Sequence, residues 1–550
     1  MTYDVVIRGG TVVDGTGAPA RTADVALDGG TVAAVGKVSE RGRQELDAAG
    51  AVVTPGFVDI HTHYDGQATW DDRLQPSSGQ GVTTVVMGNC GVGFAPVHDT
   101  DHQQLIELME GVEDLPGTVL HEGLPWSWES VAQFLDALEG RPRDIDCAAQ
   151  VCHGPVRLYV MGQRGADREP ATGEEIAEMG RLAAEGIAAG ALGFTTSRTL
   201  NHKTSRGEPT PTLTAAREEL VGIADAIGRT GAGVLQVISD FPQFDEEMET
   251  LFQMMQVSGR PLSVSLAQFA PGDGWRRMLD ALERANAAGL RMRGQVAPRA
   301  IGVMVGLEGT VNPWKASETF RSGGDLRHPE VKTRILAETG PLGNGFLRPE
   351  RLFELGDPPD YEPDPSASVA ARANREGRAP EDLLYDLLLD GMVYMPVLNF
   401  FDGNLDAVAE MLAHPYTVPG LGDGGAHVGT ICDASFPTTL LTHWGRDRNG
   451  GPVFDLPWLV ARQCRATAEA VGLTDRGVLA PGYKADVNVI DFDRLALGRP
   501  HIVADLPAGG RRLMQSAEGY AHTFVSGVEV YRAGQATGAL PGRLVRGARS

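Results

Sequence analysis

The sequence predicts an α/β protein, a (β/α)8 TIM-type barrel accompanied by a small β-sandwich domain built from both chain termini. Three observations favour this fold. Apolar runs with the length of buried strands recur through the middle of the chain, β-type segments with glycine turns occupy both ends, and two histidines directly follow the first apolar run. With 550 residues the chain is long enough to bury the core of such a barrel.

Both ends of the chain contain the same type of β-rich segment. Residues 3–36 are β-branched runs broken by Gly-Gly and Gly-Thr-Gly, which supply the positive φ angles that hairpin turns require. Similar segments return at 477–492 and 522–534. We therefore expect residues 1–53 and 477–540 to form one small β-sandwich domain.

Between these ends, eight strand-like runs predict the barrel, over residues 54–476. Continuous apolar runs are typical of strands that are buried on both faces, as in parallel barrels. The runs cover 56–63, 81–90, 146–157, 190–198, 231–240, 260–268, 290–299 and 416–427. A further run at 391–400 could replace one of the eight. The segment from about 305 to 390 is polar, rich in Pro and Gly and too long for an ordinary loop, which indicates an insertion or lid near the site.

Composition and charge narrow the class of partner. The formal net charge of -24 and the pI near 5.0 argue against nucleic acid or an anionic membrane surface, because both would repel the protein. No stretch approaches the length of a membrane span, and the N-terminus has no signal-peptide pattern. Five scattered cysteines do not form a disulfide framework. We expect a cytoplasmic protein with a small-molecule substrate; its oligomeric state is left open.

The first apolar run ends in a metal-binding pattern. Residues 54–66 read TPGFVDIHTHYDG, so that His61 and His63 follow a buried strand with the strand's own period of two. In a barrel, functional side chains gather at the carboxyl ends of the strands. Two imidazoles on one face at that position predict a metal site.

Several motifs resemble the amidohydrolase superfamily and, within it, the N-acyl-D-amino-acid deacylase (D-aminoacylase) branch. They are VVTPGFVDIHTHYD, GVTTVVMGNCGVGFAPV, GALGFTTS, GDGGAH and RGVLAPGYKADVNVID. The resemblance covers nearly the whole chain. The first motif is specific to the superfamily, and GNCG points to the D-aminoacylase branch.

The resemblance implies a role for four residues. His61 and His63 would bind the metal, Cys90 would add a thiolate where many superfamily members use a carboxylated lysine, and Asp423 would be both ligand and proton shuttle. The chemistry agrees, because a Zn²⁺ ion lowers the pKa of its bound water toward about 7 and a neighbouring carboxylate can move the proton to the leaving nitrogen.

The sequence departs from the family at the fifth and sixth strands. The family places a metal-binding histidine at the end of each, but the runs here, GVLQVISDF and LSVSLAQF, contain none. Gln236, Ser239, Asp240 and Gln268 stand in this region instead, and Asp240 could join the ligands or cap a helix. We therefore expect about one Zn²⁺ or similar divalent ion per chain rather than two.

Polar residues near the other strand ends are candidates for substrate binding. An arginine can hold a substrate carboxylate through two parallel hydrogen bonds, with structural ion pairing as the alternative. We expect Gln268 to point into the barrel mouth and contact substrate or water. The candidate residues are His153, Arg157, Arg198, His202, Gln268, Arg299 and His427.

These observations predict a metal-dependent hydrolase that cleaves a non-peptide C–N bond, of the N-acyl-D-amino-acid deacylase type. One alternative is an enzyme on the same scaffold whose altered metal site opens cyclic amides or carbamates, or catalyses a non-hydrolytic lyase or cyclisation step. Another is a metal-free relative that only binds. Metal content separates the last from the others, and a substrate screen separates the first two.

Overall fold

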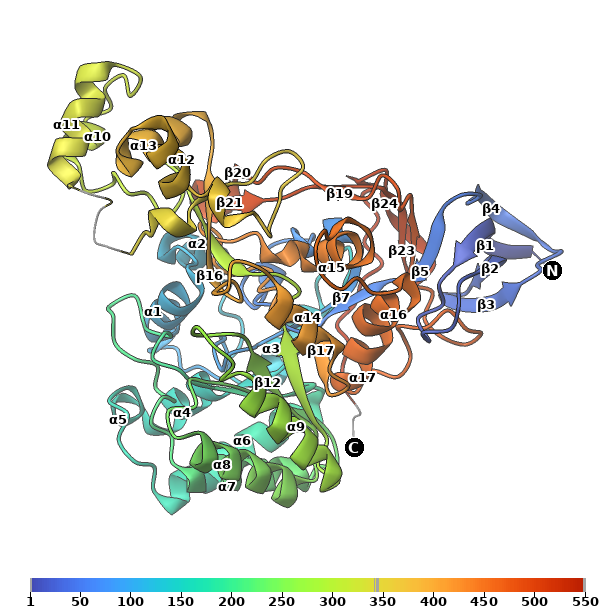
Figure 1. Cartoon of the computed structure of the whole chain (residues 1–550). Helices are drawn as coiled ribbons and strands as arrows, with labels where there is room; N and C mark the ends of the chain where they lie inside the picture. The colour runs from blue at the N-terminus through green and yellow to red at the C-terminus, as the bar shows by residue number, and fades with distance from the viewer. Residues whose placement is uncertain (1, 341, 343–345, 548–550) are drawn as a thin grey trace.

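Parallel strands alternate with helices through the middle of the chain (Figure 1). The computed structural model describes residues 2–340, 342 and 346–547. All eight stretches predicted as strands contain one, which confirms this part of the sequence interpretation. The strands are β6 (Phe57–Asp59), β7 (Val82–Met87), β8 (Asp146–Ala149) with β9 (Val151–Cys152), β10 (Gly193–Arg198), β11 (Val234–Ser239), β12 (Leu262–Leu266), β13 (Met292–Val296) and β17 (Thr417–Pro419).

These strands pair in parallel within two sheets. One sheet has the order β6-β7-β8 and the other the order β17-β13-β12-β11-β10-β9. A single residue, Gln150, separates β8 from β9. An isolated parallel bridge joins Thr62, just after β6, to Gly424, just after β17. The segments that follow the first and last parallel strands therefore lie side by side.

The helices bury one face against these strands. In α6, Thr172 and Glu175 form a capping box at the N-terminus, and Met179, Ala183 and Ile187, spaced by four residues, are buried on one face. Outside the segment 305–390, the α-helices that precede β17 are α1 (His102–Glu113), α2 (Gly117–Gly123), α3 (Val131–Glu139), α4 (His153–Met161), α5 (Gln163–Ala166), α6 (Gly173–Ala189), α7 (Arg217–Gly228), α8 (Phe244–Ser258), α9 (Arg276–Ala287) and α14 (Asp406–Ala413). After β17 come α15 (Phe436–Thr442), a π-helix (His443–Asp447), α16 (Leu456–Ala461), a second π-helix (Arg462–Ala466) and α17 (Thr467–Ala470).

The predicted strand at 146–157 is too long. The strand ends at Cys152, and His153 opens helix α4. Pro155 lies in the first turn of that helix, where its fixed φ and missing N–H are tolerated. His153 and Arg157 therefore lie on a helix instead of at the end of a strand.

Both chain termini contribute to one sheet, as predicted. Nine strands take part, and β5 from the N-terminal segment pairs antiparallel with β18 from the C-terminal segment. The strands are β1 (Thr2–Val12), β2 (Arg21–Asp28), β3 (Thr31–Gly36), β4 (Arg41–Asp47), β5 (Val52–Pro55), β18 (Val487–Ile490), β23 (Tyr520–Val525), β24 (Val528–Arg532) and β25 (Gln535–Ala536). Figure 1 shows β1–β4 at the end of the molecule away from α10 and α11.

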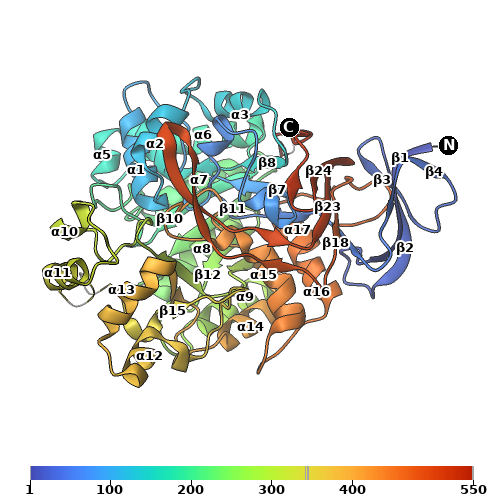
Figure 2. The same cartoon turned by 90° about the horizontal axis from the view of Figure 1, so that it is seen from above.

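Short pairs of strands complete this C-terminal part. β19 (Ala496–Leu497) pairs with β22 (Ala517–Glu518), and β20 (His501–Leu506) pairs with β21 (Gly510–Met514). The β20–β21 hairpin, red in Figure 2, extends over α2. The Leu513 amide donates to the carbonyl of Val428 (2.6 Å), so the hairpin contacts the loop that follows β17.

The predicted insertion has its own core. β14 (Ile301–Val305), β15 (Phe353–Glu354) and β16 (Val393–Leu398) form an antiparallel sheet, so the run at 391–400 belongs here and not to the parallel strands. Trp314, Ile335 and Tyr385 are buried together in this core. The helices are α10 (Glu318–Arg321), α11 (Pro329–Thr339), α12 (Val369–Glu376) and α13 (Pro380–Asp390), and Figure 1 shows α10 and α11 projecting from the rest of the molecule. Among the described residues, no helix combines the length and apolar character that crossing a membrane requires.

Candidate metal centre

Three predicted ligands meet at the carboxyl ends of β6 and β7. His61 and His63 follow β6, Cys90 follows β7, and one ligand atom from each lies within 4.8 Å of the others. The His61 Nε2 to Cys90 Sγ distance is 3.3 Å. All three side chains are buried. The arrangement offers two imidazoles and a sulfur to one point, a donor set typical of zinc sites.

The backbone around Cys90 is shaped to present its thiol. Cys90 has a φ of 55° and Gly91 a φ of 69°, both in the left-handed region. A Cβ at Gly91 would lie 2.9 Å from the Cα of Thr196, so this turn needs a glycine for space as well as for conformation. Burial raises the pKa of the Cys90 thiol to about 12, and His63 opposes this shift. A nearby cation is what would stabilise the thiolate that binds metals.

Asp423 completes the cluster from the loop after β17. Its Oδ1 lies 3.4 Å from His61 Nε2 and 3.5 Å from His63 Nε2, is buried and has no hydrogen-bond partner within the described part of the chain. Burial opposes ionisation, but the close contact with the His63 imidazole and the charges of His61 and His427 outweigh it and lower the pKa of Asp423. A buried, ionised oxygen with no hydrogen-bond partner, aimed at two imidazoles, is suited to a metal ion. The residues therefore fit a divalent metal.

A second layer of side chains orients the histidines. His61 Nδ1 donates to Gln295 Oε1 (2.6 Å), and Gln295 Nε2 donates to Ser263 Oγ (2.9 Å). A proton on Nδ1 leaves the lone pair of Nε2 free to face Cys90 and Asp423. The sequence interpretation did not include Gln295. The sequence pointed to it only as a polar residue near the carboxyl end of β13, which is buried.

Glu113 gives similar support to His63. This fully buried carboxylate ends α1, and its Oε1 lies 3.3 Å from His63 Nδ1 while Oε2 lies 3.5 Å from His427 Nε2. Burial lowers the pKa of His63, but the charge of Glu113 and the close contact with the Asp423 carboxylate outweigh it, so the pKa is raised. The sequence interpretation missed Glu113; the only signal was a glutamate next to Val112 on the apolar face of α1.

Two of the predicted substrate-binding residues lie close to this cluster. Burial, together with the charges of His427 and His63, lowers the pKa of His202 to about 3, and a 2.8 Å hydrogen bond joins its Nδ1 to Ser197 Oγ. His427 is partly exposed beside Glu113. These imidazoles are neighbours of the proposed ligands. Asp240 instead accepts from Thr199 Oγ1 (2.5 Å) and the Leu200 amide (2.7 Å) in the turn after β10, so these bonds hold a turn and do not cap a helix.

The predicted arginines are engaged inside the protein. Arg157 Nε and His153 Nε2 both bind Glu219 Oε1 at 2.9 Å, and all three side chains are buried. Arg198 binds both carboxylate oxygens of Glu247. These contacts correct the expectation that His153, Arg157 and Arg198 face substrate, because their polar atoms already have charged partners.

Arg299 and Gln268 also face protein. Arg299 Nη2 donates to Asp433 Oδ1 (3.0 Å), and its guanidinium lies 3.6 Å over the ring of Tyr361. Gln268 Nε2 donates to Asp402 Oδ2 (2.9 Å), and its Oε1 accepts from the Phe401 amide (3.3 Å). The amide of Gln268 thus contacts the loop after β16, and its contact with substrate or water stays a prediction.

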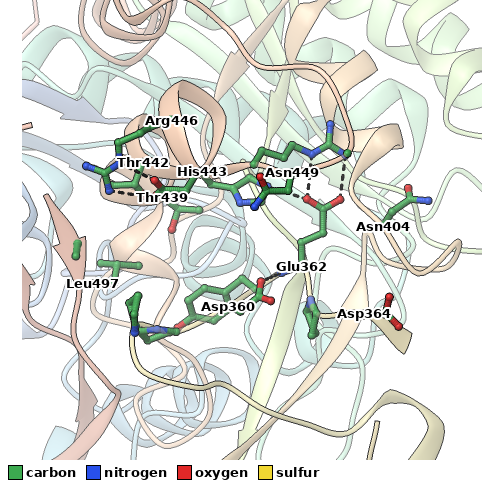
Figure 3. A pocket seen from close by; sticks show the side chains of 18 of the residues that line it. Asp360, Glu362, Asp364, Asn404, Thr439, Thr442, His443, Arg446, Asn449 and Leu497 are labelled. Atoms are coloured by element: carbon green, nitrogen blue, oxygen red, sulfur yellow. Dashed lines mark hydrogen bonds and ion pairs between the residues drawn. The ribbon is translucent and has the colours of Figure 1, made fainter. Parts of the chain in front are cut away.

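A cavity of about 610 Å³ lies elsewhere in the molecule (Figure 3). It is bounded by residues 358–365 of the insertion, by α15 and by the π-helix that follows it. Three of its charged or titratable groups pair with one another, since Arg448 binds both oxygens of Glu362 at 2.9 Å and His443 Nε2 lies 2.9 Å from the same carboxylate. None of the cluster residues lines this cavity, so we place the candidate active site at the cluster and not in this cavity.

Comparison with known proteins agrees with this geometry. The D-aminoacylase of Alcaligenes xylosoxydans xylosoxydans is 28% identical, over 99% of this chain and 97% of that protein. A solved D-aminoacylase structure from work on its binuclear metal center covers 99% of this chain and 100% of its own, with 25% identity and a TM-score of 0.67. The N-acyl-D-glutamate deacylase of Bordetella bronchiseptica, solved with zinc and a phosphonate inhibitor, shares the fold at 24% identity, the same coverage and a TM-score of 0.67. The profile of the amidohydrolase family matches residues 44–339 and 387–531, and the chain belongs to this family.

Proposed function

We propose that this member of the amidohydrolase family, a metal-dependent hydrolase of non-peptide C–N bonds, cleaves the amide of N-acyl-D-amino acids. The observation that carries the proposal is the cluster of His61, His63 and Cys90 with the Asp423 carboxylate beside it. The substrate class rests on the relatives, which include a D-aminoacylase and deacylases of N-acyl-D-glutamate and N-acyl-D-aspartate. Neither cyclic-amide opening nor a purely binding role is favoured by these relatives.

We infer that His61, His63, Cys90 and Asp423 hold one zinc ion per chain. The ion would supply a Lewis acid for the amide oxygen and a water molecule whose pKa is lowered to about 7. The fifth and sixth predicted strands, which are β11 and β12, carry Gln236 and Ser265 and no histidine. The side-chain amide of a glutamine is a poor zinc ligand. The D-aminoacylase structure concerns a binuclear centre, so the number of ions is a direct test of this difference.

Asp423 moves the proton in this proposal. Its carboxylate stays ionised because neighbouring imidazoles lower its pKa, so it can accept the proton of the attacking water. The same oxygen then returns the proton to the nitrogen as the C–N bond breaks. Glu113 and Gln295 hold the two imidazoles in the orientation that the cluster requires.

Of the residues predicted to bind the substrate, His202 and His427 remain as candidates for contact with its carboxylate. Both belong to the surroundings of the cluster, whereas the arginines proposed from the sequence have internal partners. We propose that one of these imidazoles contacts the carboxylate of a small-molecule substrate. The five free cysteines, all buried, fit a reducing compartment such as the cytoplasm.

We propose that the eight parallel strands close into a (β/α)8 barrel over residues 54–476. The single residue between β8 and β9 and the bridge from Thr62 to Gly424 support closure at both junctions of the two sheets. Residues 1–53 and 477–540 would form the β-sandwich. The segment 305–390 borders the site as a lid or insertion, since the Thr310 amide donates to the Gly429 carbonyl (3.0 Å) in the loop after Asp423.

Zinc content and a substrate panel test this function. We expect about one zinc per chain by elemental analysis, and release of free amine from N-acetyl-D-amino acids but not from their L-enantiomers. His61→Ala should lose both zinc and turnover, while the exposed His501→Ala serves as the matched control. Ring opening of cyclic amides without amine release would favour the altered-site alternative. Two zinc ions per chain would contradict the mononuclear proposal.

A further inference from the structure

A buried glutamine lies beside Cys90 on the strand that lacks the expected histidine. Gln236 is in the middle of β11 and is 1% exposed. Its Oε1 accepts a hydrogen bond from the Cys90 amide (3.3 Å). The other polar atom of the side chain, Nε2, is buried and has no hydrogen-bond partner among the described residues.

The orientation of this amide follows from its partner. A backbone N–H can only donate, so the oxygen of Gln236 must face Cys90 and the NH2 group must occupy the other branch. Buried donors are almost always satisfied in folded proteins. The hydrogen bond to Oε1 fixes the orientation of the Gln236 amide and leaves its NH2 group unpaired. This indicates that the acceptor for the NH2 group comes from outside the chain.

The hydroxyl groups on the two adjacent strands are engaged elsewhere and do not accept from Nε2 in this structure. Thr195 and Ser263 pair with Gln236 in the adjacent strands. Thr195 Oγ1 already accepts from the Gly91 amide and donates to the Gly88 carbonyl. Ser263 Oγ accepts from Gln295 Nε2. The NH2 group also has no lone pair for a metal, so it is neither a ligand nor part of the internal network.

We propose that Gln236 Nε2 donates a hydrogen bond to the carbonyl oxygen of the scissile amide and holds the oxyanion that forms there. This inference rests on the proposed amide hydrolysis. When water adds to the carbonyl carbon, the π electron pair moves to that oxygen and Asp423 takes the proton of the water. When the C–N bond breaks, the pair returns to form the C=O bond, and the nitrogen leaves with the proton from Asp423. Gln236 donates throughout and transfers no proton.

The proposed role gives a reason for a glutamine, instead of a metal-binding histidine, on β11. A donor placed next to Cys90 stabilises negative charge most strongly after the carbonyl has been attacked, when the oxygen carries a full charge. Gln236 therefore acts as a catalytic residue for charge stabilisation, whereas Gln295, which contacts His61, is a positioning residue.

Two variants separate the donor from the acceptor. Gln236→Glu keeps an oxygen for the Cys90 amide but replaces the donor by a second acceptor, and Gln236→Met keeps the length of the side chain without either. We expect both to lower kcat for an N-acetyl-D-amino acid by about 100-fold or more, with the larger loss in the Glu variant. Gln515→Met is the matched control, because Gln515 is also buried and hydrogen-bonded but contacts Tyr361 and Gly498, which lie outside the cluster.

Measurements other than turnover decide what the residue contacts. A phosphonate analogue of the tetrahedral intermediate should bind the Gln236 variants more weakly by the factor lost from kcat/KM, while inhibition by the free D-amino acid product and the zinc content stay as in the wild type. Full activity in either variant, loss of zinc, a gain of a second ion in Gln236→Glu, or unchanged phosphonate affinity would overturn the assignment. If the wild type neither releases amine nor binds the phosphonate, the proposed function fails and the role of Gln236 fails with it. An active wild type with unaffected variants overturns Gln236 alone.

Discussion

Glu362 makes the stability of the protein depend on pH in a way that can be calculated. Burial raises the pKa of this carboxyl, but hydrogen bonds from His443, Arg448 and the Leu405 amide outweigh it and lower the pKa from 4.5 to about 2 (Figure 3). Each pKa unit corresponds to about 1.4 kcal/mol, so the ionised form contributes about 3 kcal/mol to the free energy of unfolding. The side chain is 13% exposed, so solvent screens the contribution little.

The sign follows from the lowered pKa. The contribution is complete above the unfolded value near 4.5 and is lost as the pH falls toward about 2, where the folded carboxyl also becomes protonated. Glu362→Gln should therefore be less stable than the wild type by up to about 3 kcal/mol at pH 7, and the difference should shrink steadily between pH 5 and pH 3.

Guanidinium unfolding of both proteins after chelation would measure this difference. Tryptophan fluorescence is a suitable signal, because Trp444 lies 4.7 Å from the guanidinium of Arg448. The exposed Glu122→Gln is the control and should match the wild type at every pH. A difference that is constant from pH 7 to pH 3, or that grows on acidification, would refute the reasoning.

Three further predictions concern the cluster. Glu113→Gln should weaken zinc affinity by about 10- to 100-fold in a chelator competition, because it removes the charge that faces His63 Nδ1; unchanged affinity would exclude this support. Asp423→Asn should keep the fold by circular dichroism and lose on the order of 100-fold or more in kcat, and an active Asn variant would remove Asp423 from proton transfer. Cys90→Ser should lower the zinc content measured after dialysis, since a hydroxyl is a poorer zinc donor than a thiolate, whereas a full complement of zinc would mean that the sulfur is not a ligand.

The strands were predictable because burial on both faces leaves a direct trace in the sequence. β7 is buried at every position and β12 at four of its five positions, and the predicted runs that contain them each hold a parallel strand. His61 and His63 could be placed at a strand end for the same reason, since they follow such a run. Cys90 was joined to them by the family resemblance, and the structure brings all three together.

The partners of charged side chains were not predictable in this way. Arg157 finds Glu219 on α7, and Arg299 finds Asp433 in the segment after β17. These pairs depend on how helices and loops pack, which a local pattern does not contain. An arginine near the end of a strand gives the same local signal whether its carboxylate belongs to a substrate or to the protein. Glu113 was missed because its role depends on the angle at which α1 meets the strands.

The order of the proposed ligands along the chain has a consequence for biosynthesis. Cys90 and both histidines belong to the first 90 residues, whereas Asp423 follows roughly 330 residues later. At about 5–20 residues per second, the ribosome adds it on the order of tens of seconds after the others. During this interval the thiol and the two imidazoles are the proposed ligands already present, and such donors bind copper more tightly than zinc. We expect the ion in the purified protein to reflect which metals were free during translation, so growth in copper-rich medium should yield copper-loaded, poorly active enzyme.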